Sequence, residues 1–241
     1  MPPDFRGKVA LVTGVGRVGQ IGHAVATGFA RAGAQLVIAD VNAGGLAERA
    51  RELAAKGFAV EAAAGDLTTP EPARRAVATA RERFGGLDVV VNVAGGLLNY
   101  GPVLELKPEQ LERELAVNIK TTFFVSQAGI PLLRQRGGGA IVNFASMAVV
   151  KPQTQMAAYI AAKAAVAGLT RALAHELAGD RIRVNAVAPG TMRTGDNLAQ
   201  MKDAKVRWVE LDDLVAAVLY LASDEARAVS GQILPVAGAD V

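Results

Sequence analysis

Short apolar runs alternate with longer amphipathic stretches along all 241 residues of the chain. Two of the runs, residues 9–12 and 87–91, are apolar almost throughout, which is typical of strands that are buried on both faces. This alternation predicts a parallel sheet with helices on both faces. We therefore expect an α/β fold with a doubly wound, seven-stranded parallel sheet, its strands near residues 8–13, 35–40, 58–63, 87–92, 139–145, 181–187 and 232–236.

No linker, repeat or low-complexity tract divides the chain, and 51% of its residues are hydrophobic. A chain of this size can bury one large core, so we expect a single domain over residues 1–241. Two long Ala/Leu-rich helices are predicted at residues 108–135 and 155–178. Their extra apolar surface favours a homo-oligomer, either a dimer or a tetramer.

The composition argues against several classes of function. The 26 basic and 23 acidic side chains are scattered, so no nucleic-acid surface is expected. With no cysteine and only His23 and His175, a metal site is not expected either. The N-terminus lacks an apolar core and no charge-free run reaches membrane-spanning length. We expect a cytoplasmic protein that does not bind membranes.

A glycine-rich loop, residues 13–22, follows the first strand and opens a helix predicted at residues 23–32. Such a loop lets the backbone approach a pyrophosphate at the helix N-terminus. The second strand ends in Asp40, whose carboxylate would accept hydrogen bonds from the adenosine ribose and repel a 2′-phosphate. This favours NAD over NADP, although Asp40 could instead be a cap, and Arg17 argues weakly for a phosphate.

Ser146, Tyr159 and Lys163 are separated by 13 and then by 4 residues. Ser146 ends a predicted strand, and residues four apart share one face of a helix, so Lys163 would lie one turn from the phenol. A neighbouring cation lowers the pKa of a phenol, which would make Tyr159 an acid–base group. Taken alone, the Tyr–Lys spacing more often means an ordinary half-buried tyrosine and a solvated lysine.

Together these residues resemble the short-chain dehydrogenase/reductase family, from residue 5 to the last ten residues. The resemblance implies a Rossmann fold and a catalytic tetrad of Asn118, Ser146, Tyr159 and Lys163. It also implies that Tyr159 and Lys163 contact the cofactor. The other cofactor contacts that it implies are Gly14, Gly16, Arg17, Gly19, Ile21, Asp40, Asp66, Leu67, Asn92, Ala94, Gly95, Pro189, Met192 and Thr194.

Some of these residues also have simpler interpretations. Asp66 could merely cap the following helix, Asn118 could satisfy backbone groups at a helix interruption, and Asn92 could hold strands together as well as support a cofactor. The chain also departs from the family pattern. The glycine loop is two residues longer when Ile21 and Gly22 are aligned with its end, and only residues 192–211 are available for a substrate lid.

The resemblance implies hydride transfer between NAD and a secondary alcohol or ketone. Tyr159 would exchange the proton, Lys163 would lower its pKa and bind the nicotinamide ribose, and Ser146 would donate to the substrate oxygen. Asn118 would position a water. The alternatives are a 3-oxoacyl-thioester reductase of the acyl-carrier-protein type and, in another class, a non-catalytic nucleotide-sensing module.

Overall fold

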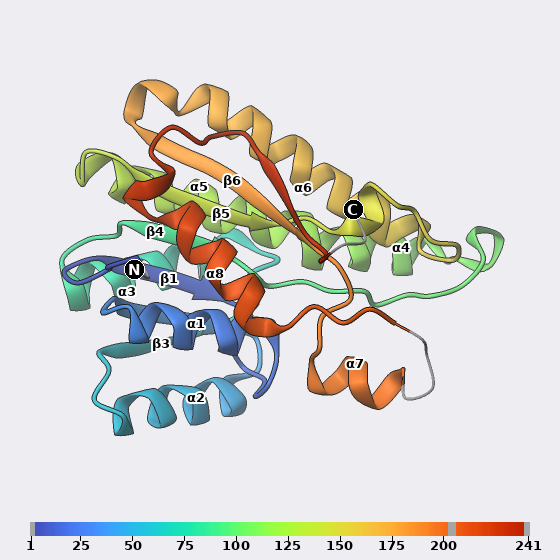
Figure 1. Cartoon of the computed structure of the whole chain (residues 1–241), viewed down its shortest axis with the longest axis horizontal. Helices are drawn as coiled ribbons and strands as arrows, with labels where there is room; N and C mark the ends of the chain where they lie inside the picture. The colour runs from blue at the N-terminus through green and yellow to red at the C-terminus, as the bar shows by residue number, and fades with distance from the viewer. Residues whose placement is uncertain (1–2, 202–205, 239–241) are drawn as a thin grey trace.

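The computed structural model describes residues 3–201 and 206–238. Its seven strands form one parallel sheet in the order β3-β2-β1-β4-β5-β6-β7, which confirms the predicted fold (Figure 1). The strands are β1 Val9–Thr13, β2 Gln35–Asp40, β3 Val60–Ala64, β4 Val89–Asn92, β5 Gly139–Phe144, β6 Ile182–Pro189 and β7 Ile233–Val236.

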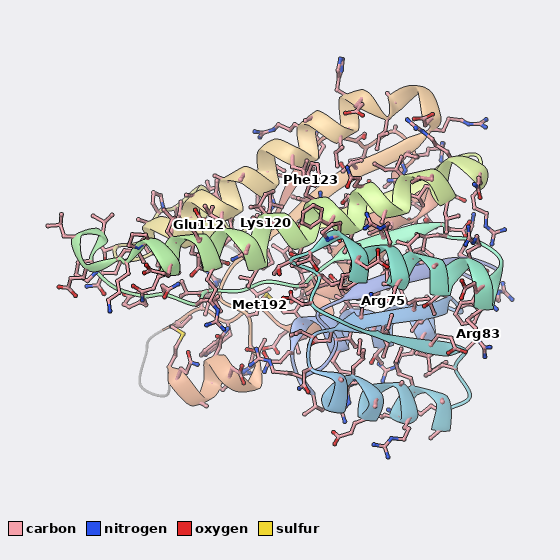
Figure 2. All side chains as sticks on the ribbon, turned by 180° about the vertical axis from the view of Figure 1, so that it is seen from behind. Arg75, Arg83, Glu112, Lys120, Phe123 and Met192 are labelled. Atoms are coloured by element: carbon pink, nitrogen blue, oxygen red, sulfur yellow. The ribbon has the colours of Figure 1, made fainter. Side chains whose placement is uncertain are left out.

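Helices cover both faces of the sheet. Figure 1 shows α1 and α8 on the near face, and Figure 2 shows α3 and α5 from behind. One core cluster joins the sheet to α1, α2 and α8, and the other joins it to α3, α5 and α6. The helices are α1 Ile21–Arg31, α2 Ala43–Ala55, α3 Pro70–Phe84, α4 Pro108–Leu115, α5 Thr121–Gln135, α6 Ala157–Glu176, α7 Gly195–Gln200 and α8 Leu211–Ala222.

The first strand shows why the sheet must be covered on both sides. Val9 and Leu11 belong to the cluster with α3 and α5, whereas Ala10 and Val12 belong to the cluster with α1 and α8. Successive side chains of a strand point to opposite faces, and all four residues are fully buried. An apolar strand of this kind is stable only between two layers of helices.

The predicted long helix at residues 108–135 is interrupted. A π-helical turn, Ala116–Lys120, joins α4 to α5 and contains Asn118. Such turns are often found at functional sites. The other differences are at element ends: β3 and β4 begin two residues later than expected, α1 begins two residues earlier, β6 extends to Pro189, and α6 is shorter than residues 155–178.

Among the described residues, α6 is the one helix whose length and composition would let it cross a membrane. This helix packs against β5 and β6 and contributes to the core of the domain. Core helices commonly have this composition, so we interpret α6 as an ordinary element of the α/β fold.

Candidate functional site

The predicted site residues gather at the carboxyl ends of the parallel strands. The chain leaves β1 toward α1 on one face and leaves β4 toward α5 on the other, although β1 and β4 are neighbours. Open α/β sheets bind ligands where the connections diverge in this way. Thr13 joins the two strand ends, because its hydroxyl accepts a hydrogen bond from the backbone N–H of Ala94 at 3.0 Å.

The glycine loop approaches its surroundings too closely for larger residues. A Cβ on Gly14 would lie 2.9 Å from the backbone nitrogen of Ala94, and one on Gly22 would lie 2.0 Å from the carbonyl oxygen of Gly14. Gly19 instead has φ +68° and open space around it. The glycine that lets α1 pack against the loop is therefore Gly22, which the predicted set of cofactor contacts omitted, while Ile21 begins α1.

Asp40 lies directly against this loop. Its carboxylate accepts hydrogen bonds from the backbone N–H groups of Gly16 and Asn42, each at 2.8 Å. A Cβ on Gly16 would lie 2.8 Å from the carboxyl carbon of Asp40, so a larger residue there would displace this carboxylate. The loop and the end of β2 therefore form one preorganised unit.

The segment after Pro189 folds over the glycine loop and holds Arg17. The guanidinium of Arg17 forms an ion pair with Asp196 of α7. Met192 is buried and pairs with Val209 in a β-bridge, and Thr194 caps α7 by accepting the N–H of Asn197. The described part of the expected lid thus contains one short helix, and residues 202–205 lie outside the described residues.

Two of the expected cofactor contacts, Asp66 and Leu67, have structural roles here. The carboxylate of Asp66 accepts hydrogen bonds from the backbone N–H and the hydroxyl of Thr68, at 2.9 and 2.7 Å. Leu67 is buried in the core cluster with α3 and α5. Asp66 therefore forms a turn ahead of α3 and does not cap that helix, because the N-cap residue is Thr69.

Asn92 ties three elements together at the end of β4. Its buried side-chain N–H₂ donates to Ser126 of α5 and to Asn143 of β5, each at 2.9 Å. Within the described part of the chain, the carbonyl oxygen of the Asn92 amide has no hydrogen-bond partner. The structure therefore shows Asn92 holding strands together, and its expected support of a cofactor stays a prediction.

The amide of Asn118 faces the loop after β4. It donates to the carbonyl oxygens of Gly96 and Glu114, at 3.0 and 2.9 Å, and accepts the N–H of Gly96 at 3.0 Å. A Cβ on Gly95 would lie 2.6 Å from the Asn118 oxygen. Asn118 thus satisfies backbone groups at a helix interruption, and its expected role toward a water stays a prediction.

Ser146, Tyr159 and Lys163 are brought together beyond β5. The hydroxyl groups of Ser146 and Tyr159 lie close enough to interact. Lys163 lies one helical turn from Tyr159, with its Nζ 5.8 Å from the centre of the phenol ring, and it donates to the carbonyl oxygen of Phe144 at 2.9 Å. A proton donor or acceptor, a hydrogen-bonding hydroxyl and a buried amine therefore share one place.

One electrostatic expectation was wrong. Burial raises the pKa of Tyr159, and although the hydrogen bond with Ser146 opposes this rise, the negative charge of Glu114 adds to it. Burial also lowers the pKa of Lys163 to about 8, against the opposing effect of Glu114. The loss of water around the phenol is thus the largest influence on the pKa of Tyr159. The amine of Lys163 is directed toward the carbonyl oxygen of Phe144.

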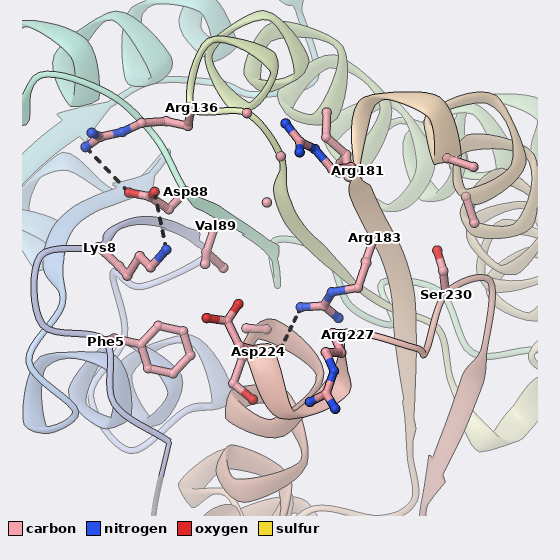
Figure 3. A pocket seen from close by; sticks show the side chains of 18 of the residues that line it. Phe5, Lys8, Asp88, Val89, Arg136, Arg181, Arg183, Asp224, Arg227 and Ser230 are labelled. Atoms are coloured by element: carbon pink, nitrogen blue, oxygen red, sulfur yellow. Dashed lines mark hydrogen bonds and ion pairs between the residues drawn. The ribbon is translucent and has the colours of Figure 1, made fainter.

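A cavity of about 590 Å³ lies elsewhere (Figure 3). Its lining includes Val89 and Ile182, which begin β4 and β6, so it opens at the opposite edge of the sheet. Asp88 pairs there with Lys8 and Arg136. Because much of its charge is satisfied internally, we do not assign the chemistry to this cavity.

Comparisons with known proteins agree with this geometry. A family model described as enoyl-(acyl carrier protein) reductase matches residues 14–238. D-threitol dehydrogenase from Mycolicibacterium smegmatis is 36% identical over 98% of this chain and 94% of that protein. The chain belongs to the short-chain dehydrogenase/reductase family.

Solved structures support the same assignment. A short-chain type dehydrogenase/reductase from Mycobacterium ulcerans matches with a TM-score of 0.92 and 32% identity, over 97% of this chain and 89% of the other. A 7α-hydroxysteroid dehydrogenase solved with NADH matches with a TM-score of 0.90 and 31% identity, over 99% and 96%. This short-chain dehydrogenase/reductase is an oxidoreductase that transfers hydride between a nicotinamide cofactor and an alcohol or ketone.

The close packing at Gly22 can be tested by adding one methyl group. Gly22→Ala should lower the free energy of unfolding by roughly 1–3 kcal/mol, because the Cβ has no space beside Gly14. Chemical denaturation measures this. Gly44→Ala in α2 is the control, since its Cβ would lie 3.8 Å from the nearest atom and should cost nothing. Equal stability of the two variants would contradict this assignment.

Proposed function

We propose that this short-chain dehydrogenase/reductase uses NAD to interconvert a small secondary alcohol and its ketone, with Tyr159 as the general acid/base. The observation that carries the proposal is the close approach of Tyr159 and Ser146 beside the buried Lys163, whose Nζ lies 5.8 Å from the centre of the phenol ring. This group lies at the end of β5, on the same edge of the sheet as the glycine loop after β1. A bound nicotinamide would supply the hydride acceptor or donor.

Each side chain then has a definite task. Tyr159 takes the proton from the substrate hydroxyl during oxidation and returns it during reduction. Ser146 is within hydrogen-bonding reach of the same phenol and donates to the substrate oxygen as charge develops there. Lys163 supplies a positive charge near the phenol, and Asn118 holds the loop after β4 in place.

The proposal of NAD as the cofactor rests on Asp40. The donors of Gly16 and Asn42 fix its carboxylate at the end of β2, where it would repel a 2′-phosphate. Arg17, the nearby cation in the loop, is already paired with Asp196. Among related structures, one was solved with NADH and two with NADP or NADPH, so the proposal rests on this chain's own residues.

The substrate class is proposed from the surroundings of the tetrad. Leu97 and Leu98, in the loop held by Asn118, are partly exposed and apolar, at 41% and 47%. Relatives are named for threitol, a small polyol with two secondary hydroxyl groups, and for cyclohexanol, a secondary alcohol. A small alcohol with an apolar side fits these observations better than an acyl-carrier-protein thioester, for which a preference for NADPH is expected. A cytoplasmic location also stays a prediction.

We also propose that the enzyme assembles as a homo-oligomer, a dimer or a tetramer, through the outer face of α4 and α5. Phe123 and Leu111 are 41% and 37% exposed there, and Phe123 lies on the outside of α5 in Figure 2. Exposed aromatic side chains on a long helix favour association with a second copy.

Replacement of the phenol hydroxyl tests the acid–base proposal. Tyr159→Phe should reduce kcat by about 10²- to 10⁴-fold while NADH still binds, because only the exchangeable proton is lost. Steady-state kinetics with a panel of secondary alcohols and fluorescence titration of NADH measure the two effects. The control is Tyr220→Phe, which changes an exposed tyrosine. Full turnover in Tyr159→Phe would remove Tyr159 from the mechanism.

Cofactor choice can be tested at the end of β2. The double variant Asp40→Asn, Val41→Arg should move the ratio of kcat/KM for NAD over NADP toward NADP by about tenfold or more, or ~1.4 kcal/mol, because repulsion is removed and a cation is added. Asn keeps an acceptor for the N–H of Gly16. Asp66→Asn is the matched control. An unmoved ratio in the double variant counts against Asp40.

Assembly can be tested on the outer helix face. Phe123→Asp should shift the sedimentation coefficient to that of a smaller species, because a charge cannot be buried without a partner. The control is Leu198→Asp on α7, another side chain that is 41% exposed. A monomeric wild type would contradict the proposal, and so would an oligomer that Phe123→Asp leaves intact.

A further inference from the structure

Glu114 is a fully buried carboxylate in α4, with none of its surface exposed. Burial of an ionised carboxylate is unfavourable unless hydrogen bonds and an opposite charge compensate for it. It lies four residues before Asn118, so both side chains are on one face of the helix. The sequence offered no other sign that this glutamate differs from Glu109 or Glu112 in the same helix.

Its hydrogen bonds go to the loop after β4 and to the tetrad. The carboxylate accepts the backbone N–H of Leu98 at 3.2 Å, the backbone N–H of Asn99 at 3.0 Å and the side-chain N–H₂ of Asn99 at 2.9 Å. Its other oxygen accepts the Asn118 amide at 3.4 Å. All of these donors are neutral amides, so they orient the carboxylate without neutralising its charge.

The opposite charge comes from α6, which packs against α4. Lys163 is 5% exposed, and the one hydrogen bond shown for its Nζ, at 2.9 Å, is to the neutral carbonyl of Phe144. Among the described residues, Glu114 is the charged group that acts on both Lys163 and Tyr159. The buried charges at this site are thus one carboxylate on α4 and one amine on α6.

We propose that Glu114 is a positioning residue of the active site, whose carboxylate keeps Lys163 protonated and fixes the loop at residues 96–99 beside the substrate. The inference rests on the proposed function, because it assigns to Tyr159 and Lys163 their acid–base roles. It adds a residue that the resemblance to the family did not supply. One side chain then contributes both to holding this loop and to the charge state of the tetrad.

The expected direction of the pH effects follows from the sign of the charge. A negative charge stabilises the ammonium of Lys163 and destabilises the phenolate of Tyr159, so it raises the pKa of both groups. Removal of this charge should lower both values. Oxidation requires the phenolate of Tyr159 together with the ammonium of Lys163. Because the pKa of Lys163 lies below that of Tyr159, activity rises up to the pKa of Lys163 and falls beyond the pKa of Tyr159. Both sides of the pH profile should therefore move to lower pH.

The test separates the effect of the negative charge of Glu114 from the effect of the length of its side chain. Glu114→Gln removes the charge at constant length and should move both apparent pKa values of kcat/KM down by about one unit. Glu114→Asp keeps the charge but shortens the side chain, so the profile should stay near that of wild type while KM rises several-fold through the loosened loop. Glu112→Gln is the matched control, because Glu112 is exposed on the same helix (Figure 2).

A second readout needs neither cofactor nor substrate. Ultraviolet titration of tyrosinate in the cofactor-free protein, with the Tyr159→Phe signal subtracted, should show Tyr159 titrating at lower pH in Glu114→Gln than in wild type. If Glu114→Gln does not fold, the KM of Glu114→Asp still tests the loop anchor. A profile and titration of Glu114→Gln that match Glu112→Gln would overturn the proposal. Loss of the proposed function would instead appear as full turnover in Tyr159→Phe.

Discussion

The close approach of backbone segments at the carboxyl ends of β1 and β4 determines the geometry of the whole site. Gly14 lies against Ala94, Thr13 accepts the Ala94 N–H, and Gly22 lets α1 pack against the same loop. A side chain at either glycine would separate the loop from the strand beside it. The preorganised end of β2, with Asp40 held by Gly16, depends on the same contact.

Buried charge is the second constraint, and it lies beside the loop after β4 and the end of β5. Lys163 and Glu114 are both removed from water, which costs folding free energy that neutral hydrogen bonds alone do not recover. A core built only for stability would place apolar residues at these positions. Their presence is consistent with an active site in which the protonation states of Tyr159 and Lys163 are adjusted by surrounding protein groups.

The interruption between α4 and α5 connects these two regions. The π turn places the Asn118 amide against Gly96, and the carboxylate of Glu114, one turn earlier, binds the next residues of the same loop. The loop after β4 is therefore held at two neighbouring points by one helical segment. This arrangement explains how a short apolar loop with Leu97 and Leu98 partly exposed can keep a fixed position beside the tetrad.

The sequence by itself determined the doubly wound sheet, the helix that carries Tyr159 and Lys163, and the glycine loop before α1, because these depend on local periodicity and spacing. Only the tertiary structure decided that Gly22 is the sterically required glycine, that Asp66 forms a turn and that Arg17 pairs with Asp196. It also reversed the expected pKa shift of Tyr159 and revealed Glu114. Burial and close approach arise between segments far apart in the chain, so no local pattern encodes them.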